Sequence, residues 1–310
     1  MQVRFLGFNF SIDSKSLTLD DYVNNMIGRH GQSYKLSEHD RFLYFNSTYS
    51  ENYYVGLLVT VKDQKTFCEL VRNSGKLVVR VNELDENTNL MDFNFFIINK
   101  VTGLGVYQYY HQSCSLNSFG HFNNRRFSEF NDYMIETEIA ETPQQLRTPA
   151  KEKSIKFKYR GKLSWEILVR SENLKNLIQE FQRVKTFEFS FFTPTVEEPE
   201  FKPLNNYIKK KLTRFSFNSK SPVTILADAI SDIVRTNDID KGKVTGIDQD
   251  GIERILRITN NPDNFGEYAY DTVATKINSL DIEQFEKSWV VQELLSKCNE
   301  YKHIFEVKTK

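Results

Sequence analysis

The residues with the clearest chemical pattern in this chain are a row of cations in its middle third. Across residues 155–162 apolar and cationic side chains alternate, which places Lys156, Lys158, Arg160 and Lys162 at every second position. A period of two is typical of a β-strand with one buried and one solvent-facing side. Cations on alternate residues of a strand stand roughly 6–7 Å apart, close to the spacing of phosphates along a nucleic-acid strand. The pattern therefore predicts a strand whose outer face contacts a polyanion.

Two further groups of cations extend this candidate surface. Residues 207–214 are expected to form a helix with a basic stripe, and two arginines lie next to each other earlier in the chain. The residues are Lys209, Lys210, Lys211, Arg214, Arg125 and Arg126. Phosphate contacts carry no sequence information, so the surface predicts binding to nucleic acid without regard to sequence. Double-stranded DNA is the expected ligand. The alternative is a solvated sheet face that prevents edge-to-edge aggregation.

The charge distribution supports a local basic surface. Residues 1–150 carry a net charge of −3, residues 151–220 carry +8 and residues 221–310 carry −5, and these values sum to the overall zero. A neutral protein can bind a polyanion through a concentrated basic region, because the local field matters more than the total charge. The acidic flanks could instead fold over the basic middle and neutralise it.

Catalytic patterns in the sequence are weaker than the charge pattern. The histidines lack metal-ligand spacing and no phosphate-binding loop is present, so we predict no metal site and no cofactor. Cys114 lies between His111 and His121, but a partly buried structural cysteine is favoured over a catalytic pair. Glu200 and Lys202 resemble half of a metal-dependent nuclease motif, in a proline-bounded loop. The sequence favours a non-catalytic protein and leaves a metal-dependent nuclease as an alternative.

Three alternating phenylalanines form another candidate feature. Phe187, Phe189 and Phe191 share one face of an expected strand, where they could stack on the bases of a single strand. The favoured alternative is that they belong to the hydrophobic core.

The rest of the chain predicts an α+β protein of two domains, with mainly antiparallel sheets packed with helices. Strands are expected at residues 3–10, 41–45, 53–61, 76–81, 163–169 and 185–192, and hairpins at 91–110 and 243–258. Helices are expected at residues 19–27, 115–134, 171–181, 222–234 and 281–304, with Ser16 or Thr18 and Ser115 among the N-caps. A short helix is expected around Phe67, Leu70 and Val71, with these side chains inward.

A proline-containing linker at residues 142–150 predicts an N-terminal α+β domain over residues 1–146. The C-terminal α+β domain, residues 147–310, would hold the basic strand and helix. The long terminal helix would pack on this domain or contribute to a homodimer. Three separated cysteines, with no signal-peptide layout and no long apolar run, predict a cytoplasmic protein.

The order of the elements resembles that of a known family. The resembling parts are the early helix at 17–23, the strand at 41–45, the aromatic hairpin at 94–110 and the lysine-rich segment at 202–212. An Asp250-Gly251 turn and a long terminal helix complete the pattern, which resembles the RexA-like phage-exclusion proteins of lambdoid prophages. The KwaB-like proteins of the Kiwa defence pair have a similar arrangement.

This resemblance implies a homodimeric DNA-binding protein of abortive infection, in a bacterium or prophage. Such a protein would sense phage nucleic acid or protein–DNA complexes and signal to a membrane-protein effector, and the resemblance assigns no catalytic residues. A protein-interaction regulator of a toxin or effector is the remaining alternative.

Overall fold

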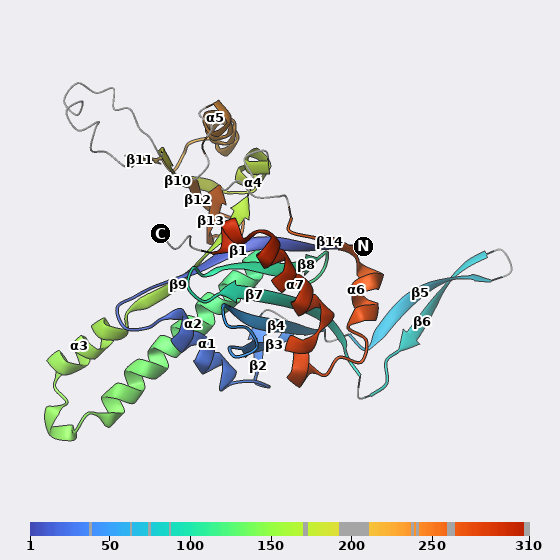
Figure 1. Cartoon of the computed structure of the whole chain (residues 1–310), viewed down its shortest axis with the longest axis horizontal. Helices are drawn as coiled ribbons and strands as arrows, with labels where there is room; N and C mark the ends of the chain where they lie inside the picture. The colour runs from blue at the N-terminus through green and yellow to red at the C-terminus, as the bar shows by residue number, and fades with distance from the viewer. Residues whose placement is uncertain are drawn as a thin grey trace. The chain divides into compact units, whose positions relative to one another are not determined.

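The computed structural model describes residues 1–36, 39–62, 64–73, 76–86, 88–169, 173–191, 211–236, 239, 242–258 and 264–306. Over these residues the chain is an α+β protein with mainly antiparallel sheets, as the sequence predicts (Figure 1). None of the described helices is long and apolar enough to cross a membrane.

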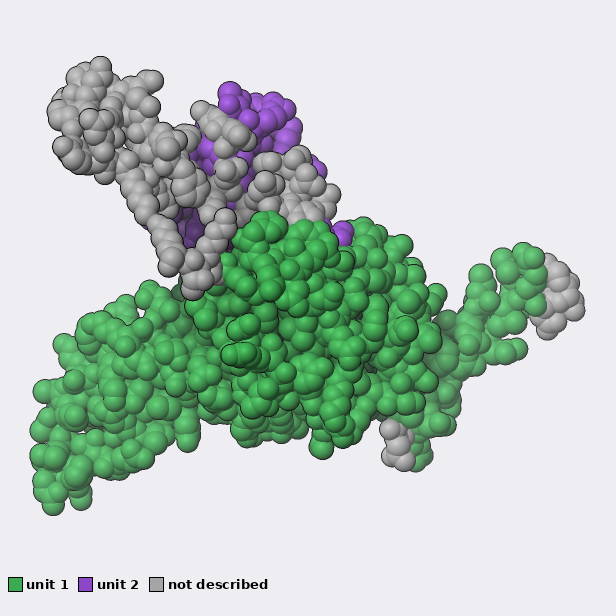
Figure 2. Space-filling model, in the orientation of Figure 1, with its two compact units in different colours: residues 1–5, 11–163, 266–310 green, residues 6–10, 164–265 purple. Residues whose placement is uncertain are grey.

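The chain divides into two compact units (Figure 2). Unit 1 comprises residues 1–5, 11–163 and 266–310, and unit 2 comprises residues 6–10 and 164–265. The boundary expected near residue 146 lies inside unit 1, and the C-terminal residues return to unit 1. A shift in composition along the sequence cannot reveal a chain that leaves a unit and comes back to it.

Unit 1 is organised around a sheet with the neighbour order β1, β8, β7, β4, β3, β2, and β14 also pairs with β1. Its strands are β1 (Gln2–Ser14), β2 (Ser33–Leu36), β3 (His39–Asn46), β4 (Tyr53–Lys62), β7 (Leu90–Asn99), β8 (Leu104–Tyr110) and β14 (Glu267–Ala269). The predicted aromatic hairpin is confirmed as β7 and β8, in which Phe96 pairs with Tyr107. Gly103 adopts a positive φ of 72° in the turn, a conformation that glycine reaches without strain.

Two helices of unit 1 pack on this sheet and on each other, α1 (Leu19–Ile27) and α2 (Leu116–Glu141). Their N-caps are Thr18, which forms a capping box, and Ser115, both of them among the expected caps. The Phe119 ring of α2 lies 4.7 Å from the rings of Phe96 and Tyr107, measured between centroids. These aromatic contacts join α2 to the core of unit 1.

The C-terminal helix is interrupted instead of continuous over residues 281–304. Its parts are η4 (Ile282–Lys287), α7 (Trp289–Glu300) and α8 (Lys302–Phe305). Ser288 has an extended backbone between η4 and α7, and its hydroxyl accepts a hydrogen bond from the Val291 amide. Serine at this position caps a new helix, so it ends the preceding one. Leu294 and Cys298 are fully buried within unit 1.

The basic segment of unit 1 is a helix, which corrects the strand predicted there. α3 (Pro149–Tyr159) begins with a proline and is capped by the Thr148 hydroxyl. Ile155 and Tyr159, one helical turn apart, are buried, whereas Phe157 is 55% exposed. The cap and the proline favour a helix more strongly than the short alternation favours a strand. Two shorter helices of unit 1 are η1 (Gln144–Leu146) and α6 (Tyr270–Lys276).

A second correction concerns β5 (Thr66–Asn73), where the sequence predicts a short helix. β5 pairs with β6 (Lys76–Glu83) in a two-stranded ribbon that extends from unit 1, at the right of Figure 1. Leu70, expected to point inward, is 67% exposed. Cross-strand pairing with β6, itself correctly predicted as a strand, determines the conformation of β5.

Unit 2 contains a sheet with the neighbour order β11, β10, β12, β13, β9, followed by residues 6–10 of β1. Its elements are β9 (Gly161–Val169), α4 (Leu174–Gln179), β10 (Arg183–Phe191), β11 (Lys211–Ser216), α5 (Val223–Thr236), β12 (Gly242–Ile247) and β13 (Glu253–Ile258). The predicted hairpin at the Asp-Gly turn is confirmed. Gly251 has a φ of 79°, and the Asp248 carboxylate accepts hydrogen bonds from the amides of Asp250 and Ile252.

Two of the three alternating phenylalanines belong to the core of unit 2. Phe187 is 1% exposed and Phe189 is 7% exposed, and both pack in one cluster with residues of α5. The favoured core interpretation therefore holds for these two, while the Phe191 side chain lies outside the described residues. β11 replaces the end of the basic helix predicted at 207–214, because it pairs antiparallel with β10.

Candidate nucleic-acid interface

Two segments far apart in the sequence meet at the start of β9 in unit 1. A Cβ atom added at Gly161 would lie 2.6 Å from the Cβ of Ser14 and 3.1 Å from the carbonyl oxygen of Asp13. Only glycine permits so close an approach of the two segments. This contact places the residues around Gly161 beside the end of β1.

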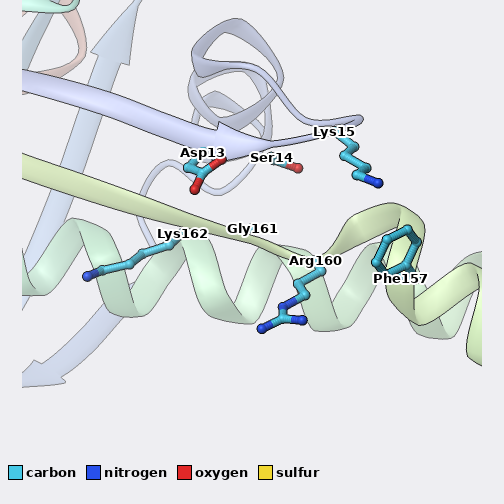
Figure 3. A pocket seen from close by; sticks show the side chains of 7 residues that line it. All are labelled: Asp13, Ser14, Lys15, Phe157, Arg160, Gly161 and Lys162. Atoms are coloured by element: carbon cyan, nitrogen blue, oxygen red, sulfur yellow. The ribbon is translucent and has the colours of Figure 1, made fainter. Parts of the chain in front are cut away.

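A hollow of about 390 Å³ lies at this junction (Figure 3). Its lining residues are Asp13, Ser14, Lys15, Phe157, Arg160, Gly161 and Lys162. The lining contains three cations and one carboxylate, so its formal charge is +2. Lys15, Arg160 and Lys162 are all exposed. We call this group of seven residues the basic hollow.

The basic hollow also contains an exposed aromatic ring. The Lys15 ammonium lies 4.0 Å from the centroid of the Phe157 ring, a cation–π contact. More than half of the Phe157 side chain remains open to solvent. A hollow lined by cations and an exposed ring combines the two contacts by which proteins bind nucleic acid, phosphate neutralisation and stacking.

Two of the four cations predicted on one face of a strand, Arg160 and Lys162, line the basic hollow. Lys156 lies on α3 one helical turn before Arg160 and is exposed. It therefore extends the basic surface outside the hollow itself.

Lys158 points to a different part of unit 1. Its ammonium forms an ion pair with the Glu138 carboxylate of α2 at 2.5 Å, and the Tyr159 hydroxyl donates to the same carboxylate at 2.7 Å. The hydrogen bond from Lys158 lowers the pKa of Glu138, and the same bond raises the pKa of Lys158. Lys158 lines a second hollow, of about 490 Å³, between α1, α2 and α3. The helix thus divides cations that a strand would have aligned.

The two arginines of α2 are engaged within unit 1. Arg126 is 9% exposed, forms an ion pair with Glu129 at 2.5 Å and stacks on the Tyr34 ring at 4.4 Å. Burial lowers its pKa, although the Glu129 carboxylate opposes that shift. Arg125 is exposed and lies 3.7 Å from the same carboxylate. Arg126 is therefore placed as a structural residue, contrary to its prediction as a phosphate ligand.

The remaining candidates belong to unit 2 or lie outside the described residues. Lys211 begins β11, and Arg214 is exposed on β11 opposite Glu188 of β10. Lys209 and Lys210, like Glu200 and Lys202, fall outside the described residues.

The environments of Cys114 and His30 indicate structural roles for both side chains. Cys114 is buried, and burial raises the pKa of its thiol, which disfavours the thiolate that a nucleophile needs. His30 Nε2 accepts a hydrogen bond from the Phe45 amide, and burial lowers the pKa of this imidazole. Among the described residues, no group of three His, Cys, Asp or Glu side chains has the arrangement of a metal site.

Of the seven residues of the basic hollow, the sequence predicts only Arg160 and Lys162 as ligands, and the two most relevant of the others are Lys15 and Phe157. Lys15 is an isolated cation after β1, and only the tertiary contact at Gly161 brings it to this place. Phe157 was expected to point inward because a strand would place it beside Ile155. The Thr148-Pro149 start signal for a helix was the evidence that could have revealed its exposure.

No protein-family model and no curated protein matches the sequence. The candidate site therefore depends on the geometry of the chain itself.

Proposed function

We propose that this protein binds double-stranded DNA without catalysis and without sequence preference through the basic hollow of unit 1. The observation that carries the proposal is that Lys15, Arg160 and Lys162 line one hollow together with an exposed Phe157 ring, which Lys15 contacts. Lys156 would add a further phosphate contact on the same side of α3. The three hollow cations come from two segments that a close backbone approach holds together, which favours a defined surface over scattered charges.

The physical basis of binding would be neutralisation of phosphates and release of their counterions. Each phosphate that a cation neutralises lowers the slope of log affinity against log salt by about 0.9 for double-stranded DNA. Phe157 would add an apolar contact that salt affects little. A protein with three such cations should therefore bind weakly at physiological salt unless it binds as a dimer.

We further propose that this binding serves anti-phage defence, as the RexA-like and KwaB-like order of elements implies. The protein would sense phage nucleic acid or protein–DNA complexes and signal to a membrane-protein effector. Loss of phage protection in a strain that carries a charge-reversed basic hollow would support this role. Full protection by that strain would remove the basic hollow from the defence function.

The direct test is fluorescence anisotropy with a labelled double-stranded oligonucleotide over a range of salt concentrations. The variant Lys15→Glu/Arg160→Glu/Lys162→Glu should lose affinity at least about tenfold at low salt. Its slope of log affinity against log salt should be less negative than that of the wild type by about 3. The matched control is Lys35→Glu/Lys276→Glu/Lys302→Glu, which reverses three exposed charges on other elements of unit 1. The control should retain most of the wild-type affinity.

Equal losses in the two triple variants would mean that only the net charge matters, and unchanged affinity in the first would exclude the basic hollow. A single-stranded oligonucleotide of the same sequence tests the stacking contribution. If the Phe157 ring stacks on bases, Phe157→Ala should weaken binding of the single-stranded oligonucleotide more than binding of the duplex.

The nuclease alternative has its own test. Pure protein is incubated with supercoiled plasmid and Mg²⁺ or Mn²⁺ for several hours. Intact plasmid would support the non-catalytic proposal, and nicked or linear products would contradict it.

A further inference from the structure

The β5–β6 ribbon, which we call the arm, lies apart from the core of unit 1. Among the described residues these two strands pair only with each other, and Figures 1 and 2 show them extending from the body of the unit. A two-stranded hairpin is marginally stable in water unless other structure covers one of its faces. The contacts between the two strands alone therefore do not account for the stability of the arm.

One face of the arm is apolar over most of its length. The cross-strand pairs Cys68–Val81 and Leu70–Val79, together with Leu77, share this face because side chains on alternate residues point the same way. The exposed fractions are 67% for Leu70, 62% for Leu77, 63% for Val79 and 60% for Val81, and Cys68 is also exposed. These five residues are the apolar face of the arm.

The opposite face of the arm has a different composition. It carries the charged pair Glu69–Arg80, the pair Phe67–Asn82 and the apolar pair Val71–Val78. Phe67 and Val71 are half-buried, and Val78 is 49% exposed. The two faces of one ribbon thus differ, with apolar side chains concentrated on the more exposed one. Contiguous exposed apolar side chains of this kind mark an interaction surface.

Charges at the two ends of the apolar face indicate its partner. Arg72 stands near the tip, opposite Leu77, and Glu83 stands near the base, opposite Thr66. If two copies pack face to face about a twofold axis that runs across the strands, the tip of each lies over the base of the other. Arg72 of one copy then lies over the Thr66–Glu83 pair of its partner, and the apolar centres meet. Such self-complementarity is what an isologous interface requires.

We propose that the apolar face of the arm packs against the same face of a second copy of this chain, and that the arm is a dimerisation element. The area is modest. Eight residues per strand extend over about 27 Å and two strands cover a width of about 10 Å. Stable interfaces commonly bury about 800 Å² per partner, so the arm forms a reversible dimer that dissociates on dilution into the micromolar range.

The oligomeric state of the full chain tests this inference without DNA. Sedimentation velocity over about 1–500 µM should show a monomer–dimer equilibrium. Leu70→Asp/Val79→Asp should abolish the dimer. The control Val71→Asp/Val78→Asp introduces the same charges into a neighbouring cross-strand pair on the opposite face, and it should dimerise at least ten times more strongly than the first variant. A monomer at all concentrations in the wild type, or equal effects of both variants, would overturn the proposal.

A charge exchange separates a dimer contact from damage to the ribbon. Arg72→Glu should weaken dimerisation, and Arg72→Glu/Glu83→Arg should restore it, because the exchanged charges meet again across the twofold axis. Failure of this rescue would exclude the proposed orientation of the two arms.

Cys68 provides a direct reporter of the interface. It is exposed and lies on the apolar face, whereas Cys114 and Cys298 are buried. Alkylation of Cys68 should slow as the protein concentration rises through the dimer range. A rate independent of concentration, or binding of the monomeric arm to phosphatidylcholine vesicles in place of dimerisation, would contradict packing against a second copy.

Discussion

α3 and the arm are two peripheral parts of unit 1 with opposite surfaces. α3 turns Ile155 and Tyr159 into the unit and carries cations on its outside, whereas the arm exposes Leu70 and Val79. The outer side of α3 therefore suits a hydrated polyanion, and the apolar face of the arm suits a dry protein contact. One unit thus carries two peripheral surfaces of different chemistry, one basic and one apolar. A dimer formed by the arms would also present two basic hollows to one DNA molecule.

The largest expected effect concerns the buried side of α3. Ile155→Ala removes a side chain that is 2% exposed, and it should lower the free energy of unfolding by about 2–4 kcal/mol. Phe157→Ala, two residues further along, should change it by about 0.5 kcal/mol or less, because this ring is 55% exposed. Urea denaturation followed by circular dichroism measures both. Similar losses in the two variants would mean that the side chains share one face, as they would in a strand.

Loss of an apolar side chain from the arm should leave the free energy of unfolding nearly unchanged, in contrast to the loss of Ile155 from α3. Leu70→Ala, measured at concentrations where the protein is monomeric, should change the free energy of unfolding by no more than about 0.5 kcal/mol. Leu57→Ala, at a fully buried position of β4, serves as the control and should cost about 2–5 kcal/mol. A loss at Leu70 as large as that at Leu57 would show that the side chain is covered within the monomer.

The smallest expected effect is the pH dependence of the contact that joins α3 to α2. The hydrogen bond from Lys158 lowers the pKa of Glu138 below its usual value of 4.5. A carboxyl with a lower pKa in the folded state contributes stability above its unfolded pKa, and this contribution is lost as the pH falls through the folded pKa. Glu138→Gln should therefore flatten the decline in stability between about pH 5 and pH 3, as measured by urea midpoints. The side chains of this ion pair are 47% exposed for Lys158 and 26% exposed for Glu138, so solvent screens the pair and the effect should be slight. An identical decline in the variant would show that Glu138 makes no such contribution.

Local signals in the sequence predicted the elements that depend on neighbouring residues. The capping residues Thr18 and Ser115, the Asp-Gly turn at Gly251 and the aromatic runs of β7 and β8 all form structures whose main contacts lie nearby in the chain. The α+β class followed from these elements. The expected grouping of cations followed only in part, since Arg160 and Lys162 came together while Lys158 and Arg126 turned elsewhere.

The helix caps, the tight turns and the concentration of positive charge in residues 151–220 can all be read from the amino-acid sequence. That Lys15 joins Arg160 and Lys162, that Phe157 is exposed and that β5 is a strand paired with β6 became clear only from the folded chain. The physical reason is that caps and turns are stabilised by hydrogen bonds within a few residues. The conformation of a short amphipathic segment depends instead on which distant surface it pairs with or packs against.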